Sequence, residues 1–413
     1  MDDPAVASRN PPPRLSRLTM LPLHTHLSHE GPVSTEIMKV VTLEEQAALH
    51  WDRSRCALWD PDGIRDPAAV GSGWGAWITP GDRPRPPSWA GLWINRIRQP
   101  WVIASGDVIR IRPDGGQASV LFRRGANANA LFATERCNSF CLMCSQPPRD
   151  TDDGWRVDEM LTLIPVIDRD EAVLGITGGE PTLLGEGLWR TIAACREHLP
   201  GTALHILSNG RRFADPNFTA AMAAVGHPAI TWAVPLYADV PELHDHVVQA
   251  RGAFDETLRG LYELARWRAR IEIRVVLHRL TVRRLGPLAR FIYRTLPFVD
   301  HIAFMGLEPM GFAKVNATEL AIDPLDYVDV LAEACFHLAN RGMTVSIYNL
   351  PLCILPESLR PFARRSISDW KNVYAPECEG CALRQSCAGF FASAGPAWRS
   401  RGIRPVEQRL EAV

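Results

Sequence analysis

The chain has 413 residues, of which 46% are hydrophobic and 22% charged, and its formal net charge is −1. This length exceeds one average domain but fits a barrel with extensions, and the composition is that of a globular protein with a large core. The small net charge argues against broad electrostatic capture of nucleic acid or of an anionic membrane. No apolar run approaches the roughly 20 residues that span a bilayer, and the N-terminus lacks the apolar segment of a signal peptide. We therefore expect a soluble cytoplasmic protein.

The first 125 residues divide into two parts by composition. Residues 1–35 are rich in Pro, Ser and Arg, which predicts a mobile tail. Residues 36–125 are strand-like and dense in Trp, and the sequence "DVIRIRPDGGQASVLFRRG" predicts a hairpin around its PDGG turn. We assign no chemistry to this β-rich region; a packing lid is the preferred interpretation, and a peptide-docking module is the alternative.

Beyond residue 126, short apolar runs alternate with longer segments of helical spacing. The runs are NALFATE, AVLGIT, ALHILS, ITWAVPLY, IEIRVVLH and HIAFMGLE. Six strand–helix units in succession predict an α/β fold with a parallel sheet, and six units fall short of the eight in a closed barrel. We therefore expect residues 126–315 to form a partial (β/α)6 TIM-like barrel with functional loops at the carboxyl ends of its strands. A C-terminal extension at 316–400, with a helix, the strand TVSIYN and an irregular cysteine-bearing segment, and a tail at 401–413 complete the expected organisation.

Ten cysteines occur, and three of them are isolated in sequence: Cys56, Cys195 and Cys335. Lone cysteines in apolar patterns are most often buried structural thiols, and we expect that role for all three. The other seven cluster, and in a reducing compartment clustered cysteines are better explained as metal ligands than as disulfides.

The first cluster, Cys137, Cys141 and Cys144 in "CNSFCLMC", directly follows the first expected strand. A structural zinc site requires four ligands, and no fourth ligand stands beside this loop, Asp150 being the nearest downstream. A [4Fe–4S] cluster bound by three thiolates leaves one iron open to an exogenous ligand. The vacancy therefore predicts a position where a substrate or cofactor binds.

Small and polar residues end the next two strands. In "GITGGEPTLLG", Gly178 and Gly179 would let the backbone approach a ligand closely, and the Glu180 carboxylate could accept hydrogen bonds from an ammonium group. In "HILSNG", Ser208 and Asn209 either contact a ligand or cap the loop.

The order of these motifs resembles that of radical S-adenosylmethionine (SAM) enzymes, in which C-x3-C-x2-C on the loop after the first barrel strand is followed by Gly-Gly-Glu. The resemblance implies that the open iron chelates SAM and that the reduced cluster cleaves it to a 5′-deoxyadenosyl radical, which abstracts hydrogen from the substrate. By this resemblance the three cysteines are the catalytic cluster ligands, and Gly178, Gly179 and Glu180 bind the methionyl end of SAM. Ser208 and Asn209 are then candidates for its ribose or carboxylate.

The fourth and fifth expected strands add weaker candidates. The segment after the fourth strand resembles the "HD…G-x-F" region of peptide-modifying relatives, but "PLYA" replaces their Ser and Asp-Gly, so we expect His244 and Asp245 to organise the loop. In "IEIRVVLH", alternation places Glu272, Arg274, Val276 and His278 on one face. Arg274 either binds the SAM carboxylate or pairs with Glu272. Glu308, at the end of the sixth strand, faces the substrate or caps a loop.

The second cysteine cluster comprises Cys353, Cys378, Cys381 and Cys387, four thiolates that suffice to close a site. Their spacing alone allows a structural zinc site. The run C-x2-C-x5-C also resembles the auxiliary-cluster extension of peptide-modifying radical SAM enzymes, known as SPASM in its full form and Twitch in its half form. Phe391 stands where the full form has a further cysteine, so the resemblance implies one additional, fully ligated [4Fe–4S] cluster, with zinc as the alternative.

The motifs together resemble the maturase of the His-Xaa-Ser peptide system. The similarity rests on "CNSFCLMCSQPPRD", "GITGGEPTLLG", "SIYNLPLCILP" and "RSISDWKNVYAPECEGCALRQSCAGFF". It implies a ribosomally made precursor peptide as substrate, a second radical SAM protein as partner, and an electron donor such as a flavodoxin or ferredoxin. A radical SAM enzyme acting on a small molecule is the alternative, and a non-enzymatic iron–sulfur carrier leaves the open three-cysteine site unexplained.

Overall fold

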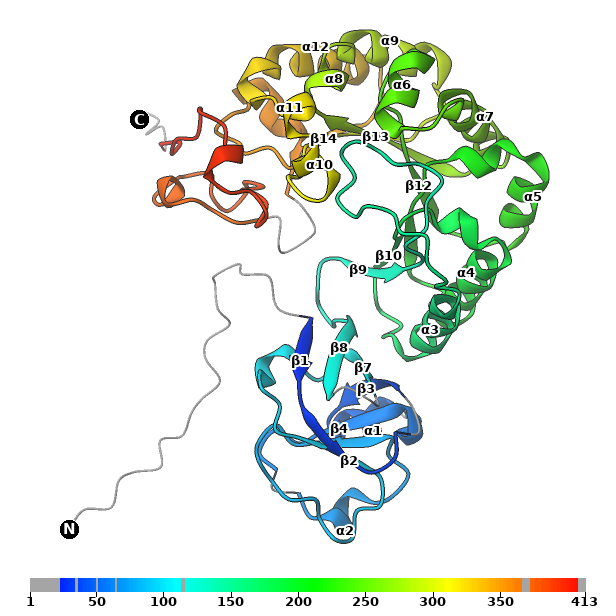
Figure 1. Ribbon diagram of the computed structural model, residues 1–413, viewed down its shortest axis with the longest axis vertical. Helices are drawn as coiled ribbons and strands as arrows, with labels where there is room; N and C mark the ends of the chain where they lie inside the picture. The colour runs from blue at the N-terminus through cyan, green and yellow to red at the C-terminus, as the bar shows by residue number, and fades with distance from the viewer. Residues whose placement is uncertain are drawn as a thin grey trace.

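The structure is a computed structural model that describes residues 23–33, 36–49, 51–63, 65–112, 116–365 and 372–407. Two sheets of eight strands each organise these residues. An N-terminal unit is followed by a larger α/β unit and then by irregular C-terminal segments (Figure 1). Residues 1–22, 34 and 35 of the expected mobile tail lie outside the described residues, but His24–His26 and Ser28–Glu30 are strands paired in the N-terminal sheet, so the tail prediction is wrong for this segment.

The N-terminal unit is a mixed sheet of parallel and antiparallel strands. Its two edge strands, β1 and β2, follow each other directly in the sequence. Its strand order is β1-β8-β7-β3-β4-β5-β6-β2, and a single residue, Leu27, separates β1 from β2. Because β1 pairs with β8 and β2 pairs with β6, the sheet closes on itself. The antiparallel pair β7–β8 confirms the expected hairpin, whose turn residues 113–115 lie outside the described part.

The elements of this unit are short. They are β1 (His24–His26), β2 (Ser28–Glu30), β3 (Ile37–Val41), α1 (Leu43–Leu49), β4 (Cys56–Trp59), α2 (Pro67–Val70), β5 (Ala76–Ile78), β6 (Leu92–Asn95), β7 (Val108–Ile111) and β8 (Gln117–Phe122). One apolar cluster of the unit is aliphatic and includes Met38 and Ile94. A second cluster contains Trp77, which meets Trp89 and Trp93 edge-on at ring-centroid distances of 5.1 and 5.3 Å. Four tryptophans of this region, Trp74, Trp77, Trp89 and Trp93, therefore pack a core, whereas Trp101 is exposed.

The α/β unit is built on a parallel sheet whose strands follow one another in sequence order. They are β9 (Asn129–Phe132), β10 (Val173–Thr177), β11 (Ala203–Leu207), β12 (Ile230–Pro235), β13 (Arg270–Leu277), β14 (His301–Gly306), β15 (Val345–Tyr348) and β16 (Ala363–Arg364). Within the described residues β9 and β16 do not pair, so the barrel stays open. The expected partial barrel is confirmed, and it is longer than six strands: β15, expected as a strand of the extension, continues the same sheet.

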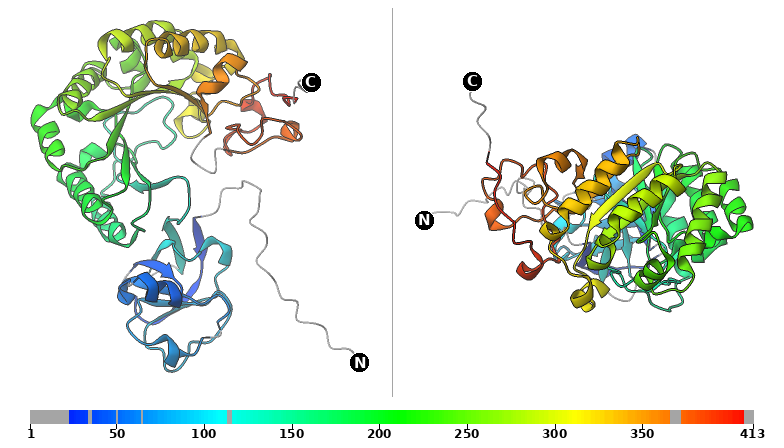
Figure 2. Two further views of the ribbon diagram at one scale, coloured as in Figure 1. Left: turned by 180° about the vertical axis from the view of Figure 1, so that it is seen from behind. Right: turned by 90° about the horizontal axis from the view of Figure 1, so that it is seen from above.

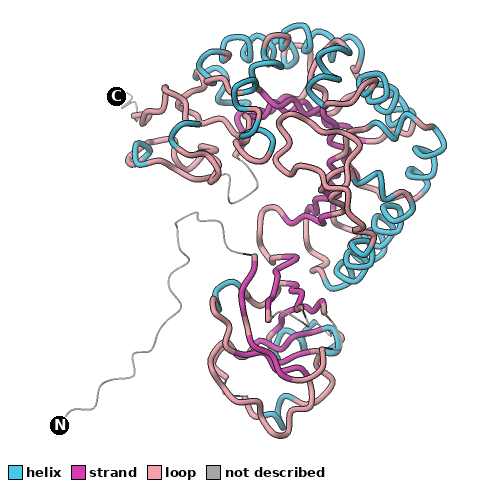
Figure 3. The backbone as a smooth tube through the Cα atoms, viewed as in Figure 1, coloured by secondary structure: helices cyan, strands magenta, loops and turns pink. Residues whose placement is uncertain are grey.

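Helices cover the outer face of this sheet, as the tube in Figure 3 and the two views of Figure 2 show. They are α3 (Trp155–Leu163), α4 (Glu186–His198), α5 (Pro216–Ala224), α6 (Pro241–Val248), α7 (Ala253–Arg266), α8 (Arg279–Val282), α9 (Leu285–Thr295) and α12 (Val328–Ala339). Two short helices, α10 (Phe312–Val315) and α11 (Ala317–Leu320), instead pack against the loop that follows β9. None of the helices within the described ranges has the length and apolarity that a membrane crossing requires.

The side chains of β13 alternate between the two faces of the sheet, as expected. Ile271 and Ile273 belong to the large core cluster under the helices, whereas Glu272 and Arg274 lie on the opposite, inner face and pair with each other. The isolated cysteines are buried structural thiols, as predicted: Cys56, Cys195 and Cys335 are all 0% exposed. The core between sheet and helices thus fixes the strands, and their carboxyl-end loops carry the remaining candidates.

A buried charge network joins the N-terminal unit to the α/β unit. Lys39 of β3 lies 2.9 Å from Asp168, which follows α3. Arg124 also bonds Asp168, at 2.9 Å, and reaches Glu45 of α1 at 2.7 Å. Burial lowers the pKa of Lys39 although the carboxylate of Asp168 opposes that shift. The two units are therefore docked through charges that neutralise one another.

Candidate active site

The three cysteines lie on the loop of residues 133–154, between β9 and α3. A turn brings the second and third together, since the Cys144 amide donates to the Cys141 carbonyl at 2.9 Å. Burial raises the pKa of the Cys141 thiol, and the nearby Cys144 and Cys137 raise it further. Three thiols that act on one another in a half-buried loop are a donor set that fits a cluster, because binding to metal removes the thiol proton.

Glycines let the start of this loop run close to the loop after β10. A Cβ on Gly178, which has φ +137°, would lie 2.5 Å from the Thr134 carbonyl oxygen, and one on Gly179 would collide with the Arg136 carbonyl. In their place, the Gly179 amide donates to Thr134 at 2.7 Å and the Glu180 amide donates to Arg136 at 2.8 Å. The two glycines thus hold the cysteine loop against its neighbour.

Glu180 is bound by the chain itself. Its Oε1 accepts hydrogen bonds from the Thr182 amide at 3.0 Å, the Thr182 hydroxyl at 2.6 Å and the Ser208 hydroxyl at 2.8 Å. Its Oε2 accepts from the Asn209 amide at 2.6 Å. The side chain is 0% exposed, and burial raises its pKa against the effect of these donors. The carboxylate therefore ties the loop after β10 to the loop after β11, and Ser208 is one of its donors.

Asn209 and the following arginine hold the middle of the cysteine loop. Asn209 Nδ2 donates to Asn138 Oδ1 at 2.6 Å. Arg211 donates to the Asn138 carbonyl and to the Ser139 hydroxyl, the latter at 3.2 Å, and its charge is balanced by Glu256 at 2.6 Å. Asn209, a sequence candidate, is thus in contact with the cysteine loop, and Arg211 is a residue that sequence reasoning missed.

Later helices and their caps hold the rest of the loop. The amides of Phe140 and Leu142 donate to the carbonyls of Val248 and Val247 at 3.0 and 2.9 Å. Asn316 Nδ2 donates to the Leu142 carbonyl at 2.9 Å. The Cys144 carbonyl accepts from the Phe312 amide at 2.8 Å. The shape of the loop therefore depends on helices α6 and α10 as well as on its own sequence.

Asp153, near the end of the loop, ties it back to its beginning. Its carboxylate accepts from the Thr134 hydroxyl at 2.8 Å and the Glu135 amide at 2.5 Å, and it pairs with Arg136 at 3.2 Å. Burial raises the pKa of Asp153, but these partners outweigh burial and lower it overall. No motif in the sequence marks this residue, because its partners lie 17 to 19 positions away.

The "HD…G-x-F" segment has the organising role that its sequence predicted. Buried His244 accepts from the Tyr237 amide through Nδ1 at 3.2 Å, and burial lowers its pKa to about 4. Asp245 accepts from the amides of Gly252 and Phe254 at 2.5 and 2.8 Å, at the start of α7. His244 therefore ties the segment after β12 to α6, and Asp245 fixes the turn between α6 and α7.

Tyr237 faces the cysteine loop from the carboxyl end of β12. It packs in one apolar cluster with Met143 and half-buried Cys141, and its ring stacks on His244 at 5.8 Å. Burial raises the pKa of its phenol, and the three thiols and Arg274 are among the charges that act on it. Sequence reasoning noted that PLYA lacks the Ser of the relatives and did not consider the tyrosine within it.

Arg274 lies on the inner face of the sheet and is only partly engaged. Its Nη1 lies 3.4 Å from Glu272 Oε1, and its Nη2 contacts Met305 Sδ at 3.0 Å. The pairing with Glu272, one of the two roles left open by the sequence, is thus present. With 23% of its side chain exposed, the guanidinium also has an open side toward the interior of the barrel.

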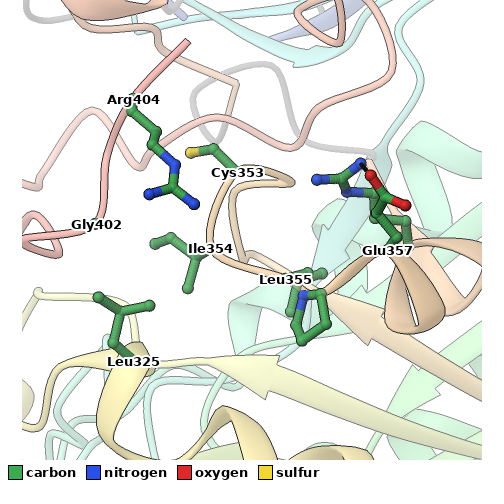
Figure 4. Close-up of a pocket in the computed structure, with 9 residues that line it drawn as sticks. Leu325, Cys353, Ile354, Leu355, Glu357, Gly402 and Arg404 are labelled. Carbon is green, nitrogen blue, oxygen red and sulfur yellow. Dashed lines mark ion pairs between the residues drawn. The ribbon is translucent and has the colours of Figure 1, made fainter. Parts of the chain in front are cut away.

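The four C-terminal cysteines line a common cavity, together with Tyr374, Arg384 and Arg404. Backbone amides point at two of the sulfurs: Leu352 and Gly389 donate to Cys387 at 3.3 and 3.4 Å, and Val406 donates to Cys381 at 3.3 Å. Amides aimed at sulfur stabilise thiolates, so this donor set fits an iron–sulfur cluster. Cys353 also lines a neighbouring hollow with Ile354 and Arg404, whose guanidinium projects into it (Figure 4).

Within the described residues, no three or more His, Cys, Asp or Glu side chains are grouped so as to hold a single metal ion. No protein-family model matches the sequence, and a comparison with curated proteins gives no match. Solved structures give distant likenesses. SuiB of Streptococcus suis bound to S-adenosylmethionine is 15% identical, with a TM-score of 0.42 over 53% of this chain and 49% of that one.

Two further structures are similar at the same level. Native anSMEcpe with bound AdoMet and a Cp18Cys peptide is 12% identical, with a TM-score of 0.43 over 67% of this chain and 91% of that one. HemN of Escherichia coli, described as a radical SAM enzyme, is 15% identical, with a TM-score of 0.41 over 52% of each chain. The chain thus spans about half of SuiB and of HemN, and likenesses this distant carry no argument about function.

Proposed function

We propose that this chain is a radical SAM enzyme whose three-cysteine loop binds a [4Fe–4S] cluster with one open iron. The observation that carries the proposal is the loop itself: Cys137, Cys141 and Cys144 stand on the loop at the carboxyl end of the first strand of an open parallel barrel, and Cys137 and Cys144 both raise the pKa of the Cys141 thiol. When bound and reduced, such a cluster supplies the electron that cleaves SAM to a hydrogen-abstracting radical.

The protein's own groups around this loop divide into supports and contacts. Glu180, Asn209 and Asp153 support the loop, because their polar atoms are bound to other parts of the chain. Tyr237 and Arg274 keep groups directed toward the inner face. We assign to the Arg274 guanidinium the binding of the SAM carboxylate, and to the Tyr237 hydroxyl a second hydrogen bond to the cofactor.

We further propose a second [4Fe–4S] cluster at Cys353, Cys378, Cys381 and Cys387. Their common cavity and the amides directed at two sulfurs support a four-thiolate site. A fully ligated cluster close to the substrate can accept the electron that remains when a new bond forms on a substrate radical. Zinc has no accessible redox change and would only brace the fold.

The proposed substrate is a precursor peptide, as in the His-Xaa-Ser maturation system that the sequence resembles, with an electron donor such as a flavodoxin or ferredoxin. The exposed Phe140 and Met310 beside the cysteine loop, 53% and 37% exposed, offer apolar surface for a peptide. A small-molecule substrate is the alternative. Coexpression with a neighbouring His-Xaa-Ser-rich precursor and mass spectrometry of that peptide distinguish the two, since an unmodified peptide favours the small molecule.

The central claim is tested by SAM cleavage. Anaerobically reconstituted, reduced protein should form 5′-deoxyadenosine slowly without peptide, and Cys141→Ala should abolish this while the C-terminal site keeps its metal. The matched control is Cys195→Ala, which removes a thiol from the core and away from both clusters. Cleavage that persists in Cys141→Ala would exclude the proposed site.

A further inference from the structure

On the inner face of the open barrel, a histidine is held between a carboxylate and a hydroxyl. Glu272 Oε2 lies 2.8 Å from His301 Nδ1, and His301 Nε2 lies 2.9 Å from Ser346 Oγ. The three residues come from the adjacent strands β13, β14 and β15, and Glu272 stands directly opposite His301 in the strand register. No step of the proposed SAM chemistry uses this group.

The carboxylate of this group is held in its charged form. Glu272 is buried, and burial alone raises its pKa, but hydrogen bonds from His205 and His301 and the charge of Arg274 hold that pKa well below its usual range. His205 Nε2 lies 3.5 Å and Arg274 Nη1 lies 3.4 Å from its Oε1. An ionised acceptor at His301 Nδ1 places the imidazole proton on that nitrogen. His301 Nε2 then presents its lone pair to the Ser346 hydroxyl.

A small residue lies next to the hydroxyl on the inner face. In the strand register Ala303 of β14 lies between Arg274 of β13 and Ser346 of β15. All three side chains belong to the inner face, so the methyl group of Ala303 is the side chain that lies between the guanidinium of Arg274 and the hydroxyl of Ser346. A carbonyl group above Ala303 would have Ser346 on one side and a guanidinium donor on the other.

We propose that Glu272, His301 and Ser346 form an acyl-transfer triad, a second reactive site on the inner face of the barrel. Such triads are recognised by geometry and role and not by order in the sequence. Ser346 is only 4% exposed, so we restrict the proposed substrates to slender acyl groups, such as those of small esters, that would reach it along the inner face.

The reaction is balanced by groups of this chain and water. Ser346 Oγ attacks the ester carbonyl and its proton passes to His301 Nε2, while Glu272 stabilises the imidazolium. In protein without bound SAM, whose carboxylate is assigned above to the same guanidinium, the negative charge that develops on the carbonyl oxygen faces Arg274. Collapse breaks the ester C–O bond, and the leaving alcohol takes the proton from His301. Water then releases the acyl group from Ser346 by the same steps in reverse, and no redox change occurs.

The chain supplies its own control for a reactivity test. Ser119 is buried like Ser346 and also contacts a histidine, His24 Nδ1, at 2.9 Å. In the described part of the chain, however, His24 has no carboxylate partner. Treating the full-length, cluster-loaded protein with a fluorophosphonate and mapping the adducts by mass spectrometry compares the two serines in one sample. We expect modification of Ser346 and none of Ser119.

Variants then assign the roles. Ser346→Ala should abolish p-nitrophenyl acetate hydrolysis above background, and Glu272→Gln should slow it by about 100-fold or more, since an amide does not orient the imidazole as a carboxylate does. Ser346→Ala should still cleave SAM. A refuted triad would therefore leave the radical SAM proposal intact, and a refuted radical SAM proposal would leave the triad intact. An unmodified Ser346, equal modification of both serines, or unchanged hydrolysis in Ser346→Ala would each overturn the triad.

Discussion

Removing the Glu180 carboxylate should destabilise the fold before it affects any cofactor. The four donors on this carboxylate are two amides and two hydroxyls, and all lie in a site with no solvent access. In Glu180→Ala the hydroxyls can rotate toward other acceptors, but the amides of Thr182 and Asn209 cannot. Each buried amide left without an acceptor costs about 1–3 kcal/mol, and the deleted side chain adds a cavity. We expect a loss of about 3–5 kcal/mol in the free energy of unfolding.

Two further variants sharpen this test. Glu180→Gln keeps the volume and one acceptor oxygen, so it should lose only about 1–2 kcal/mol. Glu186→Ala removes an exposed carboxylate from the first turn of α4 and should change stability by less than about 0.5 kcal/mol. Equilibrium urea denaturation gives the three values. If Glu180→Ala unfolds within about 1 kcal/mol of the wild type yet binds SAM weakly, the carboxylate serves the cofactor and the supporting role is wrong.

Three other outcomes follow from the site and from the contact between the units. Tyr237→Phe should weaken SAM binding by about 0.5–1.5 kcal/mol, measured by titration of reconstituted protein, and should leave the iron content unchanged; unaltered affinity would show that the phenol does not contact SAM. Burial raises the pKa of Asp107 to about 6, so the folded state binds a proton that the unfolded state does not, and stability should fall by at most about 3 kcal/mol as the pH rises from about 4 to 6. Asp107→Asn should flatten that part of the pH–stability curve, and a curve identical to that of the wild type would contradict the assignment. Replacing the three loop cysteines together should halve an iron content of about eight and leave a redox-active spectrum, whereas one retained zinc and no iron would make the C-terminal site structural.

The parts of the fold that the sequence predicted are those set by local periodicity. Strand β13 alternates polar and apolar residues over its first six positions, residues 270–275, and its two faces divide as that pattern requires. Strand β16 has two residues, Ala363–Arg364, too few to show any period, so the eighth strand could not be foreseen. The tryptophans of the N-terminal unit were visible in the composition, but their edge-on packing depends on pairing between distant strands.

The candidate site also has features that are local in the sequence and features that depend on distant residues. Cysteine spacing and the Gly-Gly-Glu order are local, so they were read from the sequence, and their assignment to a cluster and SAM stays a prediction. The partners of Glu180 were not visible, because Ser208 and Asn209 lie 28 and 29 residues away on the next strand's loop. Asp153 was missed for a similar reason, since its bonds close the loop from end to end. Side chains that support a loop have no fixed spacing from the residues they support.

The residues that hydrogen-bond to the cysteine loop come from several distant elements, and there is a physical reason for this. Residues 133–154 contain no helix or strand, and a segment of this length within a compact unit must satisfy its backbone groups elsewhere. The donors and acceptors come from the loops after β10 and β11, from α6 and from α10. Because these elements lie from about 40 to 180 residues after the first cysteine, the thiols reach their relative positions only when most of the barrel has formed. The geometry of the three-cysteine site is thus a property of the whole sheet, and a mutation that loosens any one of these elements should disturb metal binding without touching a ligand.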